Sequence, residues 1–197
     1  MFTGIIETMA QIAAIERSQT NLIYTLATPL AAELKIDQSV AHNGVCLTVT
    51  SQHNTQYTVT AIDETLQKTN LATWQVGDWV NLERSMAFNG RMDGHLVQGH
   101  VDQVGTCASI EDQTGSWLLT FEYEASKGNV TVEKGSICVN GISLTVVNSE
   151  KGRFSVAIIP YTWEHTNLRY LAKGSMVNLE FDIIGKYVQR YLSQIQA

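Results

Sequence analysis

The sequence has little of what marks the commonest functional classes. Its 197 residues contain only three cysteines, widely spaced and with no CxxC pair, so neither a disulfide framework nor a zinc site is predicted. Positive charge is scarce, and a formal net charge of -6 argues against binding to the phosphates of nucleic acid. No run of about 18 apolar residues is present, so no membrane span is expected.

Several catalytic motifs are missing as well. The sequence has no GxxxxGKS/T loop, no GxGxxG opening a helix, no GxSxG and no HExxH. Nucleotide hydrolysis, dinucleotide redox chemistry and zinc hydrolysis therefore lose support. The first seven residues, MFTGIIE, lack the basic region and long apolar stretch of a signal peptide, so a cytoplasmic location is expected.

What the chain does contain is an internal repeat. Three blocks of the first half return in the second half at a constant displacement of 97 residues: 39–49 as 136–146, 62–71 as 159–168, and 77–83 as 174–180. In the first block, six of eleven positions are identical. A constant register over three blocks indicates a duplicated domain.

Each half has the pattern of antiparallel strands. Asn43 and Gly44 form a tight-turn dipeptide between strand-forming residues, and Asn140 and Gly141 repeat it. Alternating segments at 57–62, 79–84 and 154–159 fit half-buried strands. About six strands are expected in each half, a number that favours a closed barrel because closure removes exposed edges. The polar block 63–71 predicts one or two helical turns, with Asp63 as N-cap.

The chain's last residues predict a helix. An apolar stripe with helical spacing is formed by Ile184, Tyr187, Val188, Tyr191, Leu192 and Ile195. So short a helix must pack against something, and two readings stay open: it covers its own barrel, or it pairs with other copies of the chain. We therefore predict an all-β fold with barrels at residues 1–96 and 97–183, and a helix for oligomerisation at 184–197.

Two groups of residues could carry chemistry. His95 and His100 lie in a glycine-rich stretch between the halves, at a spacing unsuited to two metal ligands on one helix face. Each is either a structural histidine or a general base in a site between domains. Cys46 has Ser143 as its counterpart in the repeat. The pair is either two small core residues or a site that diverged after duplication.

At these positions the chain resembles the riboflavin synthase family over nearly its whole length. The resemblance is carried by residues 1–7, 39–49, 64–71, 94–100, 141–146 and 159–160. It implies two six-stranded antiparallel Greek-key barrels and a C-terminal helix that joins three copies into a homotrimer. The active site would form between the first barrel of one subunit and the second barrel of a neighbour.

The implied reaction joins two molecules of 6,7-dimethyl-8-ribityllumazine. One donates a four-carbon unit to the other, which yields riboflavin and 5-amino-6-(ribitylamino)uracil. No cofactor and no metal are implied, and neither nucleic acid nor a membrane is expected as a partner. Association with lumazine synthase is a further partner that the resemblance leaves open.

The resemblance also implies site residues. In the first half, ligand contacts would come from Gly4, Ile5, Ile6, Cys46, Leu47, Thr48, Thr60, Ala61, Ile62, Asp63, Glu64 and Thr65. In the second half they would come from Lys134, Ser143, Leu144, Thr145, Ile158, Ile159, Pro160, Tyr161, Thr162 and Trp163, and at the junction from His100, Val101 and Asp102. The positions linked to catalysis are Phe2, Ser39, Cys46 and His100. Asn140 stands where some members carry aspartate, so no ionised role is expected there.

The chemistry of the lumazine makes this short set sufficient. A proton must leave a methyl group whose anion the electron-poor ring stabilises, and a nucleophile must add to a ring carbon. Positioning two flat ligands face to face supplies much of the remaining rate enhancement. We expect His100 to transfer the proton and Cys46 or Ser39 to activate the nucleophile, with these roles open to exchange. The alternative function is a non-catalytic lumazine- or flavin-binding protein.

Overall fold

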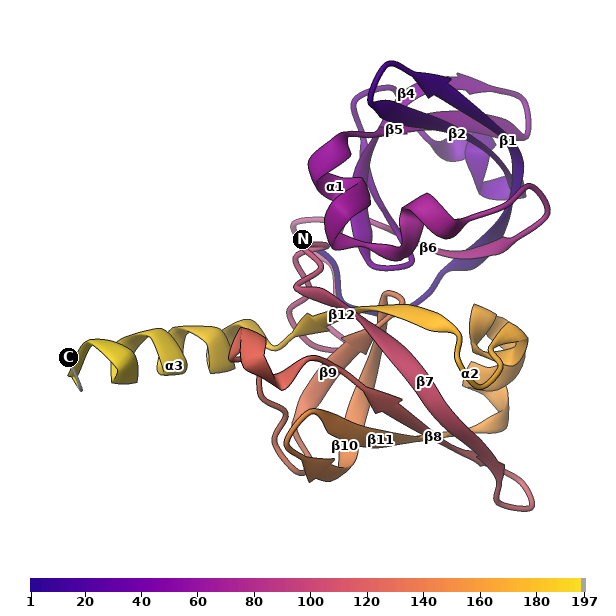
Figure 1. Cartoon of the computed structure of the whole chain (residues 1–197). Helices are drawn as coiled ribbons and strands as arrows, with labels where there is room; N and C mark the ends of the chain where they lie inside the picture. The colour runs from indigo at the N-terminus through magenta and orange to yellow at the C-terminus, as the bar shows by residue number, and fades with distance from the viewer. Residues whose placement is uncertain (196–197) are drawn as a thin grey trace.

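The computed structural model describes residues 1–195 and contains two closed antiparallel barrels of six strands each (Figure 1). The first barrel consists of β1 (Thr8–Ser18), β2 (Asn21–Ala27), β3 (Ser39–His42), β4 (Val45–His53), β5 (Gln56–Ala61) and β6 (Trp79–Arg84). The second consists of β7 (Gln103–Asp112), β8 (Trp117–Glu122), β9 (Ser136–Val139), β10 (Ile142–Glu150), β11 (Arg153–Ile158) and β12 (Met176–Phe181). The predicted fold class is confirmed.

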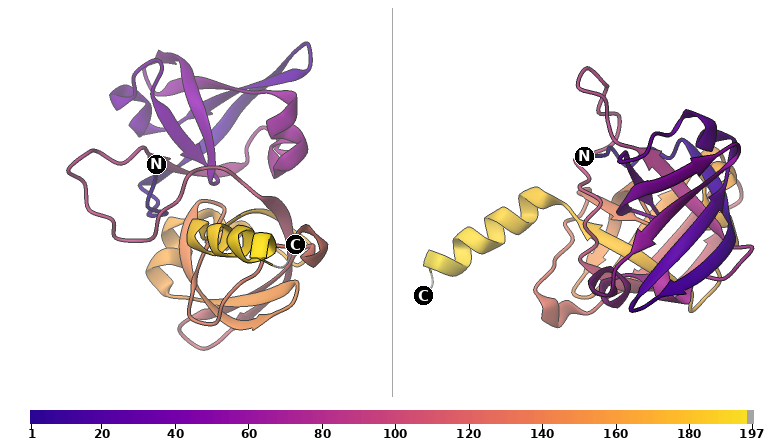
Figure 2. Two further views of the ribbon diagram at one scale, coloured as in Figure 1. Left: turned by 90° about the vertical axis from the view of Figure 1, so that its left-hand side faces the viewer. Right: turned by 90° about the horizontal axis from the view of Figure 1, so that it is seen from above.

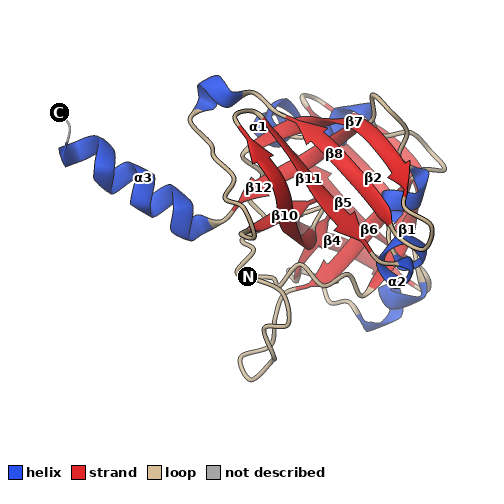
Figure 3. Cartoon of the chain, turned by 90° about the horizontal axis from the view of Figure 1, so that it is seen from below, coloured by secondary structure: helices blue, strands red, loops and turns tan. Residues whose placement is uncertain are grey.

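The two barrels have the same topology. Going around the first barrel, the strand order is β1-β2-β5-β4-β3-β6, and the second repeats it as β7-β8-β11-β10-β9-β12. Figure 3 shows that strands dominate both units, with helices only at their margins. The internal sequence repeat is therefore a repeat of one complete barrel.

The Asn-Gly dipeptides form the predicted hairpin turns. Asn43 and Gly44 have φ of 46° and 77°, and Asn140 and Gly141 have φ of 46° and 82°, as a type I′ turn requires. The two turns also meet where the barrels touch. A Cβ on Gly44 would lie 2.8 Å from the backbone nitrogen of Gly141, so only glycine allows this approach.

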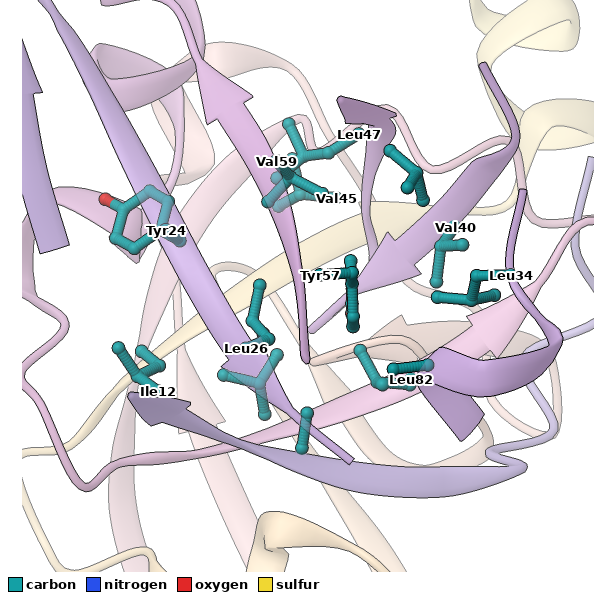
Figure 4. Packing of buried hydrophobic residues seen from close by; sticks show 14 of the residues in the cluster. Ile12, Tyr24, Leu26, Leu34, Val40, Val45, Leu47, Tyr57, Val59 and Leu82 are labelled. Atoms are coloured by element: carbon teal, nitrogen blue, oxygen red, sulfur yellow. The ribbon is translucent and has the colours of Figure 1, made fainter. Parts of the chain in front are cut away.

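Alternate residues of the strands fill each barrel. Figure 4 shows the side chains of the first core, among them Tyr24, Leu26 and Leu82, pointing into the barrel. One polar pair lies in this core: the Nε2 of His42 is 2.7 Å from the hydroxyl of Tyr57, and both residues are buried. At the equivalent positions the second barrel has Val139 and Phe154, also buried, so the two cores differ in polarity at this matched place.

Short helices connect the strands. They are η1 (Pro29–Glu33), α1 (Asp63–Lys68), η2 (Asn70–Thr73), η3 (Ala125–Lys127), α2 (Pro160–His165) and η4 (Asn167–Tyr170). The helical prediction for 63–71 holds, but Asp63 as N-cap was wrong. Asp63 is the first residue of α1, and its carboxylate accepts a hydrogen bond from the side chain of Gln67 instead of from the backbone.

Asparagines from the repeated blocks join the barrels. Asn81 of β6 donates through Nδ2 to the side-chain oxygen of Asn167 at 2.8 Å, and accepts from the Asn167 backbone at 2.7 Å. In the equivalent place, Asn178 of β12 accepts from the backbone of Asn70 at 2.8 Å. The repeated sequence Thr-Asn-Leu, at 69–71 and 166–168, therefore packs against the last strand of the other barrel. These contacts fix the orientation of one barrel relative to the other.

The helix α3 (Ile183–Ile195) extends away from the second barrel (Figures 1 and 2). The six apolar side chains of its stripe are each between 50% and 73% exposed. The helix therefore does not cover its own barrel with this face. Residues 196 and 197 of the predicted helix lie outside the described residues. No helix within residues 1–195 is both long and apolar enough to cross a membrane.

Candidate active site

A cavity of about 270 Å³ opens at one end of the first barrel. It is lined by Val45, Cys46, Glu64, Thr65, Lys68, Thr69, Gly99, His100 and Val101. Five of these belong to the predicted ligand set, although they come from β4, from α1 and from the segment between the barrels. The fold thus brings part of the predicted first-half set to one cavity. Gly4 and Ile6, which were assigned to the first site, lie against the second barrel instead: the Gly4 carbonyl accepts the backbone N–H of Ser143, and Ile6 packs on the second core.

The segment between the barrels lies directly against β4. Cys46, half-buried on β4, donates its backbone N–H to the carbonyl oxygen of Gly99 at 2.9 Å. Gly99 has a φ of +79°, and a Cβ there would lie 2.6 Å from the Cβ of Cys46. Glycine is therefore needed for this contact. The next residue, His100, has an exposed side chain at the cavity.

The second barrel has an equivalent arrangement around Ser143. Ser143 on β10 donates its backbone N–H to the carbonyl oxygen of Gly4 at 2.8 Å. Gly4 has a φ of +78°, and a Cβ there would lie 2.6 Å from the Cβ of Ser143. In the same barrel, Trp163 of α2 stacks on Trp117 with ring centroids 4.6 Å apart, and both pack on the second core. In each barrel, a segment with a glycine thus lies alongside one strand: Gly99 beside β4 and Gly4 beside β10. The two barrels therefore have related sites.

The second site contains a histidine that the predicted set omitted. The Nδ1 of His95 lies 2.7 Å from the hydroxyl of Ser143, and the side chain of His95 is buried. Burial lowers the pKa of His95, which favours the neutral ring. Its place in a glycine-rich stretch with a second histidine was the available signal. The spacing of the two histidines did not indicate that each reaches a different barrel.

The remaining predicted residues occupy distinct environments. Phe2 is fully buried and packs with Ala41, Val97 and Cys138, while Leu47 and Ala61 face the first core. Ser39 starts β3 opposite Thr48 and is half-buried. Exposed residues are Ile5, Thr48, Ile62, Asp63, Lys134, Thr145, Ile159, Pro160 and Tyr161; half-buried ones are Ile6, Thr60, Asp102, Leu144 and Thr162; Ile158 is buried.

Asp102 anchors the end of the segment that carries His100. Its carboxylate accepts from the backbone N–H of Phe181 at 2.8 Å and pairs with Lys186 of α3 at 2.7 Å. The aspartate thus ties this segment to the second barrel and to the base of α3. Within residues 1–195, no group of three or more histidine, cysteine or acidic side chains is placed to hold a metal ion.

The paired sites on duplicated barrels define a class of ligand-binding proteins. The family model for the lumazine binding domain matches the chain twice, at residues 3–85 and 98–182. A riboflavin synthase of Actinobacillus pleuropneumoniae is 43% identical, with 98% of this chain and 90% of that protein aligned. A riboflavin synthase of Bacillus subtilis is 37% identical over the same shares. The chain therefore belongs to the riboflavin synthase family.

Solved structures show the same fold. A crystal structure of LumP complexed with riboflavin superposes with a TM-score of 0.85, covering 92% of this chain and 99% of that one at 22% identity. A structure of LumP complexed with 6,7-dimethyl-8-(1'-D-ribityl) lumazine gives a TM-score of 0.83, also at 22% identity. At that level of identity the likeness concerns the arrangement of the two barrels.

Proposed function

We propose that the chain converts two molecules of 6,7-dimethyl-8-ribityllumazine into riboflavin and 5-amino-6-(ribitylamino)uracil. The observation that carries the proposal is near full-length similarity to riboflavin synthases, combined with a first-barrel cavity that holds both Cys46 and His100. Each barrel binds one lumazine. The two products together contain all the atoms of the two substrates, so the reaction needs no external oxidant or reductant.

The residues around the first cavity divide the chemical work. His100, exposed at the cavity, moves the proton of the ligand's methyl group, and Cys46 or Ser39 activates the nucleophile. Phe2 is buried behind Cys46, so it acts by supporting the site instead of by touching the ligand. Holding two flat ligands face to face lowers the barrier by roughly 7 to 11 kcal/mol in favourable cases.

The second candidate function is a carrier that binds a lumazine or flavin without turnover. The similarity of the fold to LumP is the observation that favours it. The test is to incubate the purified full chain with 6,7-dimethyl-8-ribityllumazine and to follow flavin absorbance and fluorescence. Steady formation of riboflavin supports the enzyme. Saturable binding with no riboflavin after prolonged incubation would make the chain a carrier.

We also propose that α3 joins three chains. Its apolar stripe is exposed, which suits a helix that packs against copies of itself. In such a trimer the first barrel of one subunit faces the second barrel of a neighbour, and one lumazine from each meets the other. The cytoplasmic location and the association with lumazine synthase stay predictions.

A further inference from the structure

A buried glutamate holds the backbone that carries His100. Glu180 lies on β12 of the second barrel and is 3% exposed. Its Oε1 accepts the backbone N–H of Gln98 at 2.6 Å, and its Oε2 accepts those of Gly99 and His100, both at 2.9 Å. Three consecutive N–H groups therefore converge on one carboxylate. The same Gly99 gives its carbonyl oxygen to the backbone of Cys46, in the first barrel.

Glu83 makes the equivalent arrangement for the segment that contacts the second barrel. It lies on β6 of the first barrel and is 5% exposed. Its Oε1 accepts from the backbone and hydroxyl of Thr3 at 2.6 and 2.7 Å, and its Oε2 accepts from the backbone of Gly4 at 2.9 Å. Gly4 in turn gives its carbonyl oxygen to Ser143, in the second barrel. The two glutamates occupy the same position of the repeated block.

The two segments are therefore exchanged between the barrels. Phe2 and Val97 pair with each other where the segments cross, with N···O distances of 2.7 and 3.1 Å. Beyond the crossing, Val101 packs on the first core and Ile6 packs on the second. Each segment thus leads into one barrel but completes the site of the other.

We propose that Glu180 is a positioning residue for the site of the first barrel, and that Glu83 is a positioning residue for the site of the second. Glu180 sets the place of His100 and of the Gly99 carbonyl relative to Cys46, although it does not line the first cavity. This assignment rests on the proposed function, because it presumes that Cys46 and His100 act on a lumazine.

The chemistry of the clamp favours a carboxylate. An ionised carboxylate accepts hydrogen bonds at both oxygens, and bonds of N–H groups to a charged acceptor are stronger than those to a neutral one. Burial raises the pKa of Glu180, and the N–H groups of Gln98, Gly99 and His100 together with Lys186 oppose that rise. A glutamine in this place would present an NH₂ group to at least one N–H donor, so at least one of the three bonds would be lost.

The test compares Glu180→Gln with Glu83→Gln in the full chain. Hydrogen exchange, read on peptides that cover residues 97–101 and 2–5, measures how firmly each segment is held. Alkylation of Cys46 by iodoacetamide, located by peptide mass, measures access to the first site. Cys46 is a selective reporter because Cys107 and Cys138 are buried.

Glu180→Gln is expected to speed exchange in 97–101 at least about tenfold, which corresponds to a local opening made easier by lost hydrogen bonds. It should also speed alkylation of Cys46 and lower kcat more than it raises KM, with residues 2–5 unchanged. Glu83→Gln should give the reverse pattern: faster exchange in 2–5 and unchanged alkylation of Cys46. Glu180→Asp, which keeps the charge and shortens the reach, should give a weaker form of the Glu180→Gln pattern.

Two results would overturn the proposal. One is that Glu180→Gln loosens both segments equally, because the glutamate would then only support the fold. The other is that exchange in 97–101 and alkylation of Cys46 stay as in the parent. If Glu180→Gln does not fold, Glu180→Asp decides by the same two probes. Both probes work without turnover, so a chain that makes no riboflavin would refute the proposed function while the positioning role is still measured.

Discussion

The Nδ1 of His95 lies 2.7 Å from the hydroxyl oxygen of Ser143, so a residue from between the barrels orients the second-barrel counterpart of Cys46. Within residues 1–195, no histidine is hydrogen-bonded to the side chain of Cys46, and the histidine that lines the first cavity, His100, is exposed. The two sites thus share one plan but carry different groups. This difference suits a reaction in which one lumazine donates the four-carbon unit and the other accepts it.

Replacing His95 should weaken one ligand site of the two. In His95→Ala the hydroxyl of Ser143 loses its orienting partner, and the affinity for lumazine at one site should fall about tenfold, equivalent to about 1.4 kcal/mol. Fluorescence titration that resolves two sites per chain measures this. His53→Ala is the control, because His53 is exposed and lies near the far end of β4. Equal loss at both sites would show that His95 only stabilises the fold.

Changes at the first site should separate turnover from binding. His100→Ala should lower kcat by about 10²- to 10⁴-fold, the usual range for one positioned acid or base, with little change in ligand Kd. Cys46→Ser should act in the same direction, and it installs the residue that the second barrel already has. Steady-state kinetics and fluorescence titration give the two quantities. A parallel fall in affinity and rate would mean that these residues shape the pocket and do not act in the reaction.

Charges on the stripe of α3 should separate the subunits. The double variant Val188→Glu with Tyr191→Glu places two carboxylates on the exposed apolar face, and light scattering should shift from about three chains to about one. Ser193→Glu is the control, because position 193 lies on the opposite side of the helix. Substitutions are preferable to truncation, since truncation after Gly185 also removes the Lys186 partner of Asp102. An unchanged mass in the double variant would remove α3 from the interface.

The polar pair of the first core should make stability depend on pH. Burial lowers the pKa of His42 to about 4, from 6.5. The unfolded chain therefore takes up the proton first as pH falls, so stability is full above pH 6.5 and is lost toward pH 4, by roughly 3 kcal/mol.

The second barrel supplies the matched control for this prediction. The double variant His42→Val with Tyr57→Phe copies Val139 and Phe154, the buried residues at the same places. Urea unfolding at pH 7 and at pH 4.5 should show a smaller loss of stability in the variant than in the parent. Equal losses would show that His42 does not titrate in the folded barrel differently from the unfolded chain.

Local signals predicted the barrels well. The Asn43-Gly44 turn depends on the conformational freedom of two adjacent residues, so the local sequence was enough to predict it. Alternation also predicted β6, but as a half-buried strand. Asn81 and Glu83 on its polar face are buried as well, because both bond to segments outside their own sheet. The repeat of 97 residues then carried each assignment to the other half. The N-cap of α1 was misassigned because Asp63 bonds to Gln67 and leaves the preceding Ile62 as the cap.

Contacts between segments that are distant in the sequence could not be predicted from these local patterns. Glu180 is the second-last residue of β12, and in the sequence it is indistinguishable from a solvated carboxylate. Its three hydrogen bonds cross 80 to 82 residues and exist only because the segment before β7 turns back over the first barrel. His95 and His100 are five residues apart, yet they serve different barrels because the chain crosses at Val97 between them. The resemblance gave His100 as a site residue but not His95, and it did not give this division.

The exchanged segments bear on how the chain arose. Because the segment before each barrel completes the neighbouring one, a single-barrel precursor with the same plan would have reached its full site only as a pair of identical chains. Each chain would have placed the segment before its first strand against the other barrel. In the fused chain, the exchange of these two segments takes place within one polypeptide, and the two copies are free to differ in sequence. Cysteine could then persist at position 46 while serine took position 143, and a symmetric binder could become an enzyme with two unlike halves.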